Sequence, residues 1–385
     1  FVVAGTTEIT GTNNVQRPPN AQSLIINGDM GIWQRGTGTV TTTGAYVGVD
    51  RFKISEDTDG SFSTERHTMS NAEKTTTGFD YALQADCTGT DASIGASQTA
   101  EISQTIEGQN CMVLQYGTSN AKDITLSFWV KSSKTGTYTA AIRKRDVTKY
   151  DCPQEYTISV ADTWEKKVIH ISPTAGSTSF ITASAGAISN DNGAGLAIQF
   201  NLAMGSNNDG TTNTWEAANK PSTSNQVNWM DSTSNDFYLT GVQLEVGEFT
   251  SSTLPPFQRE SYGDNLLRCM RYYNIFGNAA SKPLGLAAFS SATAAYAGPL
   301  AYPVEMRSSP TITITGGSGG VEATAGFAIN HSASNDWFQT FSSSSTSTKE
   351  CQLYVDADIS ATDGDAGRCK TGNIEFGKVE ASAEL

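Results

Sequence analysis

Alternation between apolar and polar residues is the dominant pattern along this chain. The clearest example is 124–131, where Ile124, Leu126, Phe128 and Val130 alternate with Thr125, Ser127, Trp129 and Lys131. The same period of two returns in 163–171, 195–203 and 351–359. This period is typical of a β-strand with one buried face. Clusters of Gly, Ser, Asn and Asp separate the runs, so the pattern predicts an all-β protein.

The run 237–246 contains a break in this alternation. Its apolar phase slips by one residue at Gly241, and a one-residue slip at a glycine predicts a β-bulge. Farther along, TITIT at 311–315 predicts another strand. By contrast, GGSGG at 316–320 and SSSSTST at 342–348 predict loops or flexible tips.

Helical periodicity is convincing in one place, 263–276. There Leu266, Leu267, Met270 and Tyr273 lie on one side of the predicted helix, and Asp264 is its expected N-cap. A short helix after a long β region predicts a domain boundary. The expected organisation is an N-terminal linker or anchor segment at 1–21, a β domain at 22–258, a connecting helix at 259–276 and a smaller β domain at 277–385.

The charge balance excludes some partners. The 385 residues include 25 Lys and Arg against 39 Asp and Glu, which gives a net charge of −14. Binding to phosphate backbones needs an excess of basic residues, so no nucleic-acid partner is expected. Charged residues make up only 17% of the chain, below the roughly 25% of an average protein. No apolar run reaches the ~18 residues that a transmembrane helix needs.

Motifs for cofactors and catalysis are missing. The six cysteines form no C-x-x-C pair, and the histidines, His67, His170 and His331, lie far from them in sequence. We therefore expect buried thiols, no metal centre and no cofactor. GGSGG lacks the Lys of a phosphate loop, and no G-x-S-x-G elbow occurs. Paired carboxylates for glycoside hydrolysis stay open, as does calcium at the acidic clusters 57–59, 207–209 and 356–365.

The tryptophans are the candidate ligand-binding residues. Trp129 falls on the polar face of its predicted strand, and Trp215, Trp229 and Trp337 lie in polar, loop-like surroundings. Exposed aromatic rings on a polar β scaffold can stack on sugars. The alternative is that these rings pack under loops or in a subunit interface.

Two segments resemble the beginning and end of modules found in phage tail-fibre and other virion fibre proteins. The first is LIINGDMGIWQRGTGTV at 24–40, followed by YVGVDRFK at 46–53, where Phe52 replaces a more usual Trp. The second, in 240–276, is similar to a Q-L-E-x-G … P-F-x-x-R-x-Y … L-x-x-C-x-R-Y-Y ending. Its matching residues are Gln243, Leu244, Glu245, Gly247, Pro256, Phe257, Arg259, Tyr262, Cys269, Arg271, Tyr272 and Tyr273.

The resemblance implies a jelly-roll-like sandwich, similar to carbohydrate-binding modules, in a fibre that is usually trimeric. It covers about 24–276, says little about 277–385 and names no catalytic residue. We expect Asn27-Gly28-Asp29 to form a turn and Arg35 to pair with Asp50 or Glu245. We also expect Arg51, Arg259 and Arg271 to be structural partners.

Together these features predict a non-enzymatic virion protein, a phage tail fibre assembled in the host cytoplasm. Its expected partners are its own copies in a homotrimer, other tail or capsid proteins, and a host-surface glycan or outer-membrane component. The residues 277–385 are the candidate distal tip. The expected trimer contacts are Leu266, Leu267, Met270 and Tyr273. Two alternatives remain, a capsid-attached or decorating fibre and, less favoured, a polysaccharide depolymerase.

Overall fold

The computed structural model describes residues 23–41, 44–217, 219–331 and 335–385. The predicted segment 1–21 lies outside these residues. Contacts divide the chain into two compact units. The first runs to Gly31 and continues with Thr37–Val47 and Phe52–Glu260, while the second comprises Ile32–Gly36, Gly48–Arg51 and Ser261–Leu385. Two short pieces of the N-terminal motif thus belong to the second unit.

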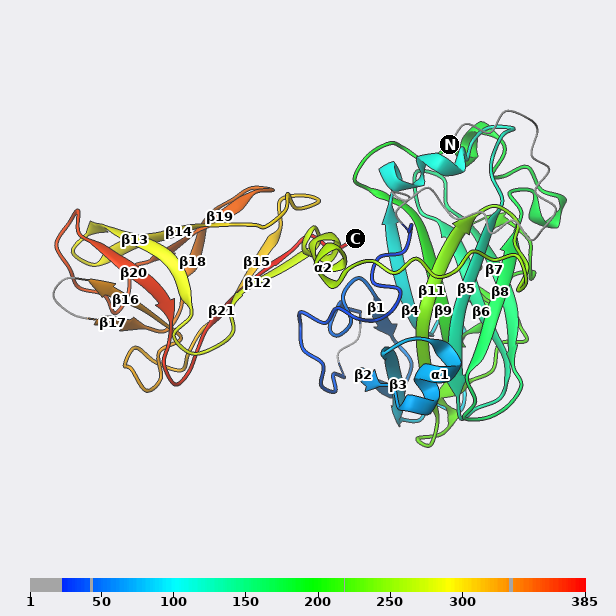
Figure 1. The fold of residues 1–385 in the computed structure, drawn as a ribbon, viewed down its shortest axis with the longest axis horizontal. Coiled ribbons are helices and arrows are strands. Elements are labelled where there is room, and N and C mark those ends of the chain that lie inside the picture. The colour runs from blue at the N-terminus through cyan, green and yellow to red at the C-terminus, as the bar shows by residue number, and fades with distance from the viewer. Residues whose placement is uncertain (1–22, 42–43, 218, 332–334) are drawn as a thin grey trace, which may run out of the picture. The chain divides into compact units, whose positions relative to one another are not determined.

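The first unit is a jelly-roll-like sandwich of two antiparallel sheets (Figure 1). One sheet has six strands in the order β1 (Lys53–Glu56), β4 (Thr99–Glu107), β9 (Ala194–Met204), β6 (Gly136–Lys144), β7 (Tyr150–Ile158) and β10 (Glu216–Ala217). The other has five strands in the order β2 (Ser61–Thr68), β3 (Tyr81–Gly89), β11 (Asp236–Val246), β5 (Ile124–Ser132) and β8 (Glu165–Ile171).

Aromatic rings fill the space between the two sheets. Phe128 on β5 lies 4.9 Å from Phe200 on β9 and 5.0 Å from Tyr156 on β7, measured between ring centroids. Phe128 and Phe200 are completely buried. Each projects from its strand at the apolar phase of the two-residue period, so the predicted all-β fold and the strands around 124–131 and 195–203 are confirmed.

Two glycines allow close packing around β11. The pairing of β11 with β5 shifts between Thr240 and Gln243, and Gly241 has a φ of 61°, which confirms the predicted bulge. A Cβ atom on Gly241 would lie 2.5 Å from the Phe79 ring. Gly28, in the turn expected at 27–29, approaches β11 so closely that a Cβ atom would lie 2.1 Å from the Val242 carbonyl oxygen. Only glycine fits at these approaches.

A short helix, α1 (Asn71–Thr77), lies outside the sequence predictions. It begins with a capping box, in which the Ser70 hydroxyl accepts from the Glu73 backbone and the Glu73 carboxylate accepts from the Ser70 backbone. This S-x-x-E spacing is a readable start signal. The apolar pattern does not predict this helix because the helix contains only seven residues, too few to show a helical period.

The second unit contains a curled sheet and a smaller one. The larger has the order β17 (Asn335–Phe338), β16 (Phe327–His331), β20 (Ala366–Thr371), β13 (Pro283–Ser291), β14 (Ala294–Ala301), β19 (Glu350–Val355) and β18 (Ser342–Thr346). The smaller has the order β12 (Tyr273–Gly277), β21 (Lys378–Ser382) and β15 (Thr311–Thr315). Their buried side chains form one core, with Phe327, Phe338 and Phe341 in mutual ring contact.

Two sequence predictions in this unit are wrong in extent. The helix predicted at 263–276 is α2 (Tyr262–Met270), capped by Ser261 rather than Asp264, and Tyr273 already lies in strand β12. Pairing with β21 supplies ladder hydrogen bonds to 273–277, and this tertiary contact outweighs a marginal helical preference. The serine run is likewise not all loop, because Ser342–Thr346 forms edge strand β18.

Short 3₁₀ helices connect several strands of the first unit, at Gly108–Leu114, Ala175–Ser177, Ser184–Gly186, Ser206–Asn208 and Trp229–Asp231. Within the described ranges, no helix has the length and apolar character needed to cross a membrane.

Candidate functional site

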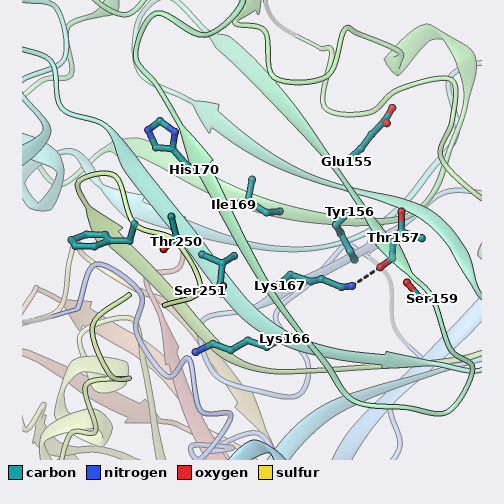
Figure 2. Close-up of a pocket in the computed structure, with 12 residues that line it drawn as sticks. Glu155, Tyr156, Thr157, Ser159, Lys166, Lys167, Ile169, His170, Thr250 and Ser251 are labelled. Atoms are coloured by element: carbon teal, nitrogen blue, oxygen red, sulfur yellow. Dashed lines mark hydrogen bonds between the residues drawn. The ribbon is translucent and has the colours of Figure 1, made fainter. Parts of the chain in front are cut away.

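An open groove of about 670 Å³ lies on one side of the first unit's sandwich. Its floor is edge strand β8, from Lys166 to His170. Strand β7 contributes one wall, and the segment Phe249–Ser251 after β11 contributes the other. Figure 2 shows these side chains around the opening. The groove thus brings together edge strand β8 of the five-stranded sheet, β7 of the six-stranded sheet and the segment after β11.

The groove is lined mainly by hydrogen-bonding side chains. The lining residues are Glu155, Tyr156, Thr157, Ser159, Lys166, Lys167, Val168, Ile169, His170, Phe249, Thr250 and Ser251. Val168, Ile169 and Phe249 supply apolar surface. Hydroxyl groups come from both walls, so a ligand lying in the groove would meet donors and acceptors on either side.

Some of these groups are already committed to protein partners. The Lys167 ammonium donates to the Thr157 carbonyl oxygen at 2.5 Å (Figure 2). It also donates to Glu165 at 2.6 Å. Glu155 accepts from Thr223 and Asn225. These contacts hold the shape of the groove, and Lys167 also points a charge inward from an edge strand, a feature that discourages pairing with foreign strands.

Other lining groups remain available to a ligand. Lys166 forms no ion pair with a described residue, and the side-chain hydroxyls of Thr157, Ser159 and Ser251 have no described hydrogen-bond partner. Burial lowers the pKa of Lys166, because its ammonium is partly desolvated without a compensating anion. The site therefore offers one cation and several hydroxyls on a β framework.

His170 stands at the far end of the groove. Its Nε2 lies 2.9 Å from the Asp123 carboxylate, and its Nδ1 lies 4.0 Å from Glu248. The imidazole is thus oriented by acidic neighbours rather than aimed at another groove residue. Glu155 is the carboxylate among the lining residues, whereas glycoside hydrolysis ordinarily uses a pair.

Trp129 is half-buried, and its surroundings differ from those predicted. It lies on the outer face of the five-stranded sheet, opposite Lys166 on β8. Its ring packs against a second small core of Met69, Phe79, Ala82 and Trp164, together with Tyr238 and Phe257. The sheet's polar face is covered here by α1 and the segment near Phe257, so Trp129 is a packing residue rather than an open platform.

Trp215 and Trp229 are completely buried, which contradicts their prediction as exposed ligand-binding rings. The Trp215 Nε1 donates to the Ser172 carbonyl at 2.9 Å, and the Trp229 Nε1 donates to the Asp236 carbonyl at 3.1 Å. Each ring also makes an edge contact with another aromatic residue, Tyr116 and Phe62 respectively. Several of these partners, such as Tyr116 and Phe62, are distant in sequence, so local composition does not reveal the burial.

Trp337 lies on β17 of the second unit and is half-buried. The Lys370 ammonium lies 4.9 Å from its ring centroid. A cation over one ring face is a favourable contact, so Lys370 is a structural partner of this ring.

The motif residues at 34–35 and 50–51 build the frame of the second unit. Asp50 accepts from the Gln34 backbone and side chain, and the Arg35 guanidinium lies 3.6 Å from it. The expected Arg35–Asp50 pair is therefore present. Glu384 pairs with both Arg35 and Arg51, a partner more than 330 residues away that the sequence did not suggest.

Two tyrosines complete this cluster. The Arg51 guanidinium carbon lies 3.4 Å from the Tyr272 ring centroid, and that of Arg35 lies 3.6 Å from the Tyr273 ring centroid. Arg51 is fully buried. Burial raises the pKa of Asp50 to about 6, although Arg35 and Gln34 act in the opposite direction. The W-Q-R-G, D-R and R-Y-Y motifs thus meet in one structural cluster.

The other two arginines of the motifs contact backbone carbonyls. Arg259 donates to the Gly78 carbonyl, and its guanidinium lies over the Phe79 ring. Arg271 donates to the Glu305 carbonyl at 3.3 Å. Phe257, from the P-F motif, meets Phe79 edge-on at 4.9 Å.

The predicted trimer contacts fall into two groups. Leu266, Leu267 and Met270 lie on α2, and Leu267 is 43% exposed. Tyr273 is buried under Arg35 on β12, so it is not available to a second copy. Tyr273 was predicted to lie on the helix with the other three residues, but α2 ends at Met270 and Tyr273 begins strand β12.

All six cysteines are free and buried. Burial raises the pKa of Cys111, Cys152 and Cys369 to about 12. In the part of the chain that the structure describes, no three His, Cys, Asp or Glu side chains gather in an arrangement suited to a metal ion.

Comparison with known proteins yields structural likeness only. No protein-family model matches the chain, and no curated protein matches it. The family 11 carbohydrate-binding module of Clostridium thermocellum, solved with a mixed-linked tetrasaccharide, is 11% identical. The match covers 56% of this chain and 99% of the module, with a TM-score of 0.28.

Two further solved structures are similar at the same level. The CBM22-1 xylan-binding domain from Paenibacillus barcinonensis is 10% identical, covers 60% of this chain and 97% of that domain, and has a TM-score of 0.26. The enzymatically active domain of bacteriophage CBA120 tailspike protein 4 is 14% identical. The match covers 58% of this chain and 21% of that chain, with a TM-score of 0.28. Likenesses at this level assign no function to the chain.

Proposed function

We propose that this chain is a non-enzymatic fibre protein of a virion, a phage tail fibre, that contacts a host-surface glycan during adsorption. The fibre assignment is supported by the two bracketing sequence motifs. In the structure, the residues of those motifs form turns, ring contacts and buried ion pairs. Such motifs describe a building module rather than a catalytic centre.

The observation that carries glycan binding is the groove beside β8. Sugars are recognised through hydrogen bonds to their hydroxyls and through apolar contact with their CH faces. The groove provides Lys166, three uncommitted hydroxyls and the apolar surface of Val168 and Phe249. A polar site on a rigid β framework suits this kind of ligand.

A binding experiment tests this part directly. The full chain is titrated with oligosaccharides prepared from host-surface polysaccharide, using the wild type, Lys166→Ala and the control Lys134→Ala. Lys134 pairs with Asp231 on the surface outside the groove. Loss of a charged hydrogen bond should weaken binding about tenfold for Lys166→Ala only. Equal affinities for all three proteins would remove the groove from the proposal.

The second unit is proposed as the distal, receptor-facing part. Deleting 277–385 is a poor test, because it would remove Glu384 and leave Arg35 and Arg51 without that partner. Point variants on exposed positions of this unit are therefore preferred. Adsorption to host cells that is unaffected by every such variant would argue against a tip role.

Three measurements distinguish the remaining alternatives. Antibody labelling of intact particles in micrographs separates a tail fibre from a capsid-attached or decorating fibre. Release of new reducing ends from host polysaccharide would indicate a depolymerase instead. Light scattering tests the homotrimer, for which a mass three times 40.8 kDa is expected. Leu267→Glu should then split the trimer, because burying an unpaired charge is costly.

A further inference from the structure

The outer face of the seven-stranded sheet in the second unit carries two tyrosines side by side. Tyr296 on β14 lies directly opposite Tyr354 on β19. Ala288 on β13 pairs with Tyr296, and Ser342 on β18 pairs with Tyr354. The four side chains therefore form one row across four neighbouring strands, which lie about 4.8 Å apart in a hydrogen-bonded sheet.

The alternation along each strand places this row away from the core. Ala295, Ala297, Leu353 and Val355 are buried in the hydrophobic core, and Ala287 and Phe289 flank Ala288 in the same way. Tyr296 and Tyr354 occupy the opposite phase. Tyr296 is 40% exposed, and the two ring centroids lie 5.0 Å apart. Both rings are thus presented to solvent by a rigid scaffold.

We propose that Tyr296 and Tyr354 form a platform on which a neutral saccharide stacks. This inference rests on the proposed glycan-binding function and gives it a place in the second unit. The flanking side chains in this row, Ala288 and Ser342, are small and exposed, so they do not cover the two rings. Carbon–hydrogen faces of a pyranose ring suit the negative face of a tyrosine ring.

Polar groups beside the rings match the hydroxyls of a sugar. Gln352 precedes Tyr354 by two residues on the same face, and its carbonyl oxygen accepts from the Ser344 hydroxyl at 3.0 Å. That contact leaves the Gln352 amide hydrogens as donors. Single charges of both signs flank the platform, with exposed Arg368 opposite Leu286 on one side and Asp356 after Tyr354 on the other. Since neither sign dominates, the platform favours a neutral sugar.

The size of the apolar surface favours a saccharide over another copy of the chain. An aromatic side chain presents about 150–250 Å² in total, so Tyr296 at 40% exposure contributes at most roughly 100 Å². Tyr354 is half-buried and contributes less than Tyr296, and Leu286, 69% exposed, is a further large apolar side chain on this face. A stable interface buries about 800 Å² per partner, which this patch does not approach.

The test measures affinity with the full chain. Cellohexaose, maltohexaose and mannohexaose are the neutral probes, and a hyaluronan hexasaccharide is the acidic probe. Tyr296→Ala and Tyr354→Ala should each weaken binding of a neutral probe about five- to tenfold, whereas Tyr296→Phe and Tyr354→Phe keep the ring and should stay within about twofold. Phe376→Ala is the matched control, since Phe376 is 45% exposed elsewhere in this unit.

Each other outcome overturns the platform. It fails if no neutral probe binds, if only the acidic probe responds to the tyrosine variants, or if those variants change the mass in light scattering. It also fails if the alanine variants bind like wild type. In that last case Lys166→Ala separates the two hypotheses, because reduced binding there preserves the proposed glycan-binding function while removing the platform. Thermal unfolding of every variant within a few degrees of wild type excludes a folding defect.

Discussion

Each unit holds a carboxylate whose pKa is shifted, but the two shifts have opposite directions: Glu73 is half-buried, whereas Asp50 is completely buried. In the first unit, Glu73 accepts hydrogen bonds from Lys131, Trp164, Ser70 and His67. Burial alone would raise its pKa, but these donors together lower it well below the usual range. In the second unit, Asp50 is completely buried, and the cost of desolvation outweighs the effects of Arg35 and Gln34, so its pKa is raised to about 6. The balance between desolvation and stabilising contacts decides the direction of each pKa shift.

This contrast reflects how each unit is built. Glu73 ties α1 to the outer face of a sandwich whose main core lies elsewhere. Asp50, Arg35, Arg51 and Glu384 instead join two short excursions of the N-terminal chain to the C-terminal end. A defect in the Glu73 contacts should therefore loosen one face, whereas a defect in the arginine cluster should affect the whole second unit.

The largest effect is expected for Arg51→Ala. It leaves the buried Glu384 carboxylate without one cation, and breaking a buried pair costs about 3–5 kcal/mol. The second unit should open at lower denaturant, while the first is unchanged. The readout is thiol labelling followed by mass spectrometry, because Cys87, Cys111 and Cys152 report on the first unit, and Cys269, Cys351 and Cys369 report on the second.

Lys378→Ala is the control for this variant. Lys378 and Glu380 form a more exposed pair in the same unit, 2.9 Å apart, so its removal should cost less than about 1 kcal/mol. Labelling of the first-unit cysteines at lower denaturant in Arg51→Ala than in wild type would contradict the expectation that the arginine cluster stabilises the second unit alone.

Glu73→Gln should have the next largest effect, confined to the first unit. The amide keeps the size of the side chain but removes the charge that Lys131, Trp164 and the Ser70 backbone hydrogen-bond to. A loss of about 2 kcal/mol is expected in denaturant unfolding, because bonds to a charged acceptor are worth about 1.5–3 kcal/mol. Glu65→Gln, on neighbouring β2, is the control, and an equal loss there would show that the Glu73 contacts are not special.

Lowering the pH from 7 to 5 should raise the free energy of unfolding of the second unit by about 1 kcal/mol. The pKa of Glu73 is lowered on folding, so its contribution is present above the pKa of an unfolded glutamate and is lost as the pH falls below it. The pKa of Asp50 is raised, so its contribution is present at low pH and is lost as the pH rises through about 6. Lowering the pH from 7 to 5 protonates Asp50 in the folded protein and should therefore stabilise the second unit.

The check is urea unfolding at pH 7 and pH 5, followed by cysteine labelling in each unit. Asp50→Asn should remove the pH 5 gain of the second unit and leave the first unit's response as it was. An unchanged gain in this variant would assign the effect to another group.

The smallest effect is expected in the native state itself. None of the six thiols should react with iodoacetamide at neutral pH without denaturant, because all are buried and the pKa of each is raised by burial. Rapid native labelling confined to Cys269, Cys351 and Cys369 would show that the second unit opens spontaneously.

Local pattern by itself determined much of the β structure. The runs at 124–131, 195–203 and 311–315 are strands because alternation buries one face wherever a sheet forms. The bulge at Gly241 was also readable, since a phase slip and a glycine coincide there. Of the two partners predicted for Arg35, Asp50 and Glu245, the structure places Asp50 beside its guanidinium.

Only the tertiary structure decided which residues those patterns bring together. Tyr273 is a strand residue because β21 pairs with it, and Trp215 and Trp229 are buried against residues distant in sequence, Tyr116 and Phe62. Glu384 reaches Arg51 across 333 positions, and the groove needs three segments that are separate in sequence. Periodicity reports the faces of one strand, whereas contacts between faces depend on the path of the whole chain.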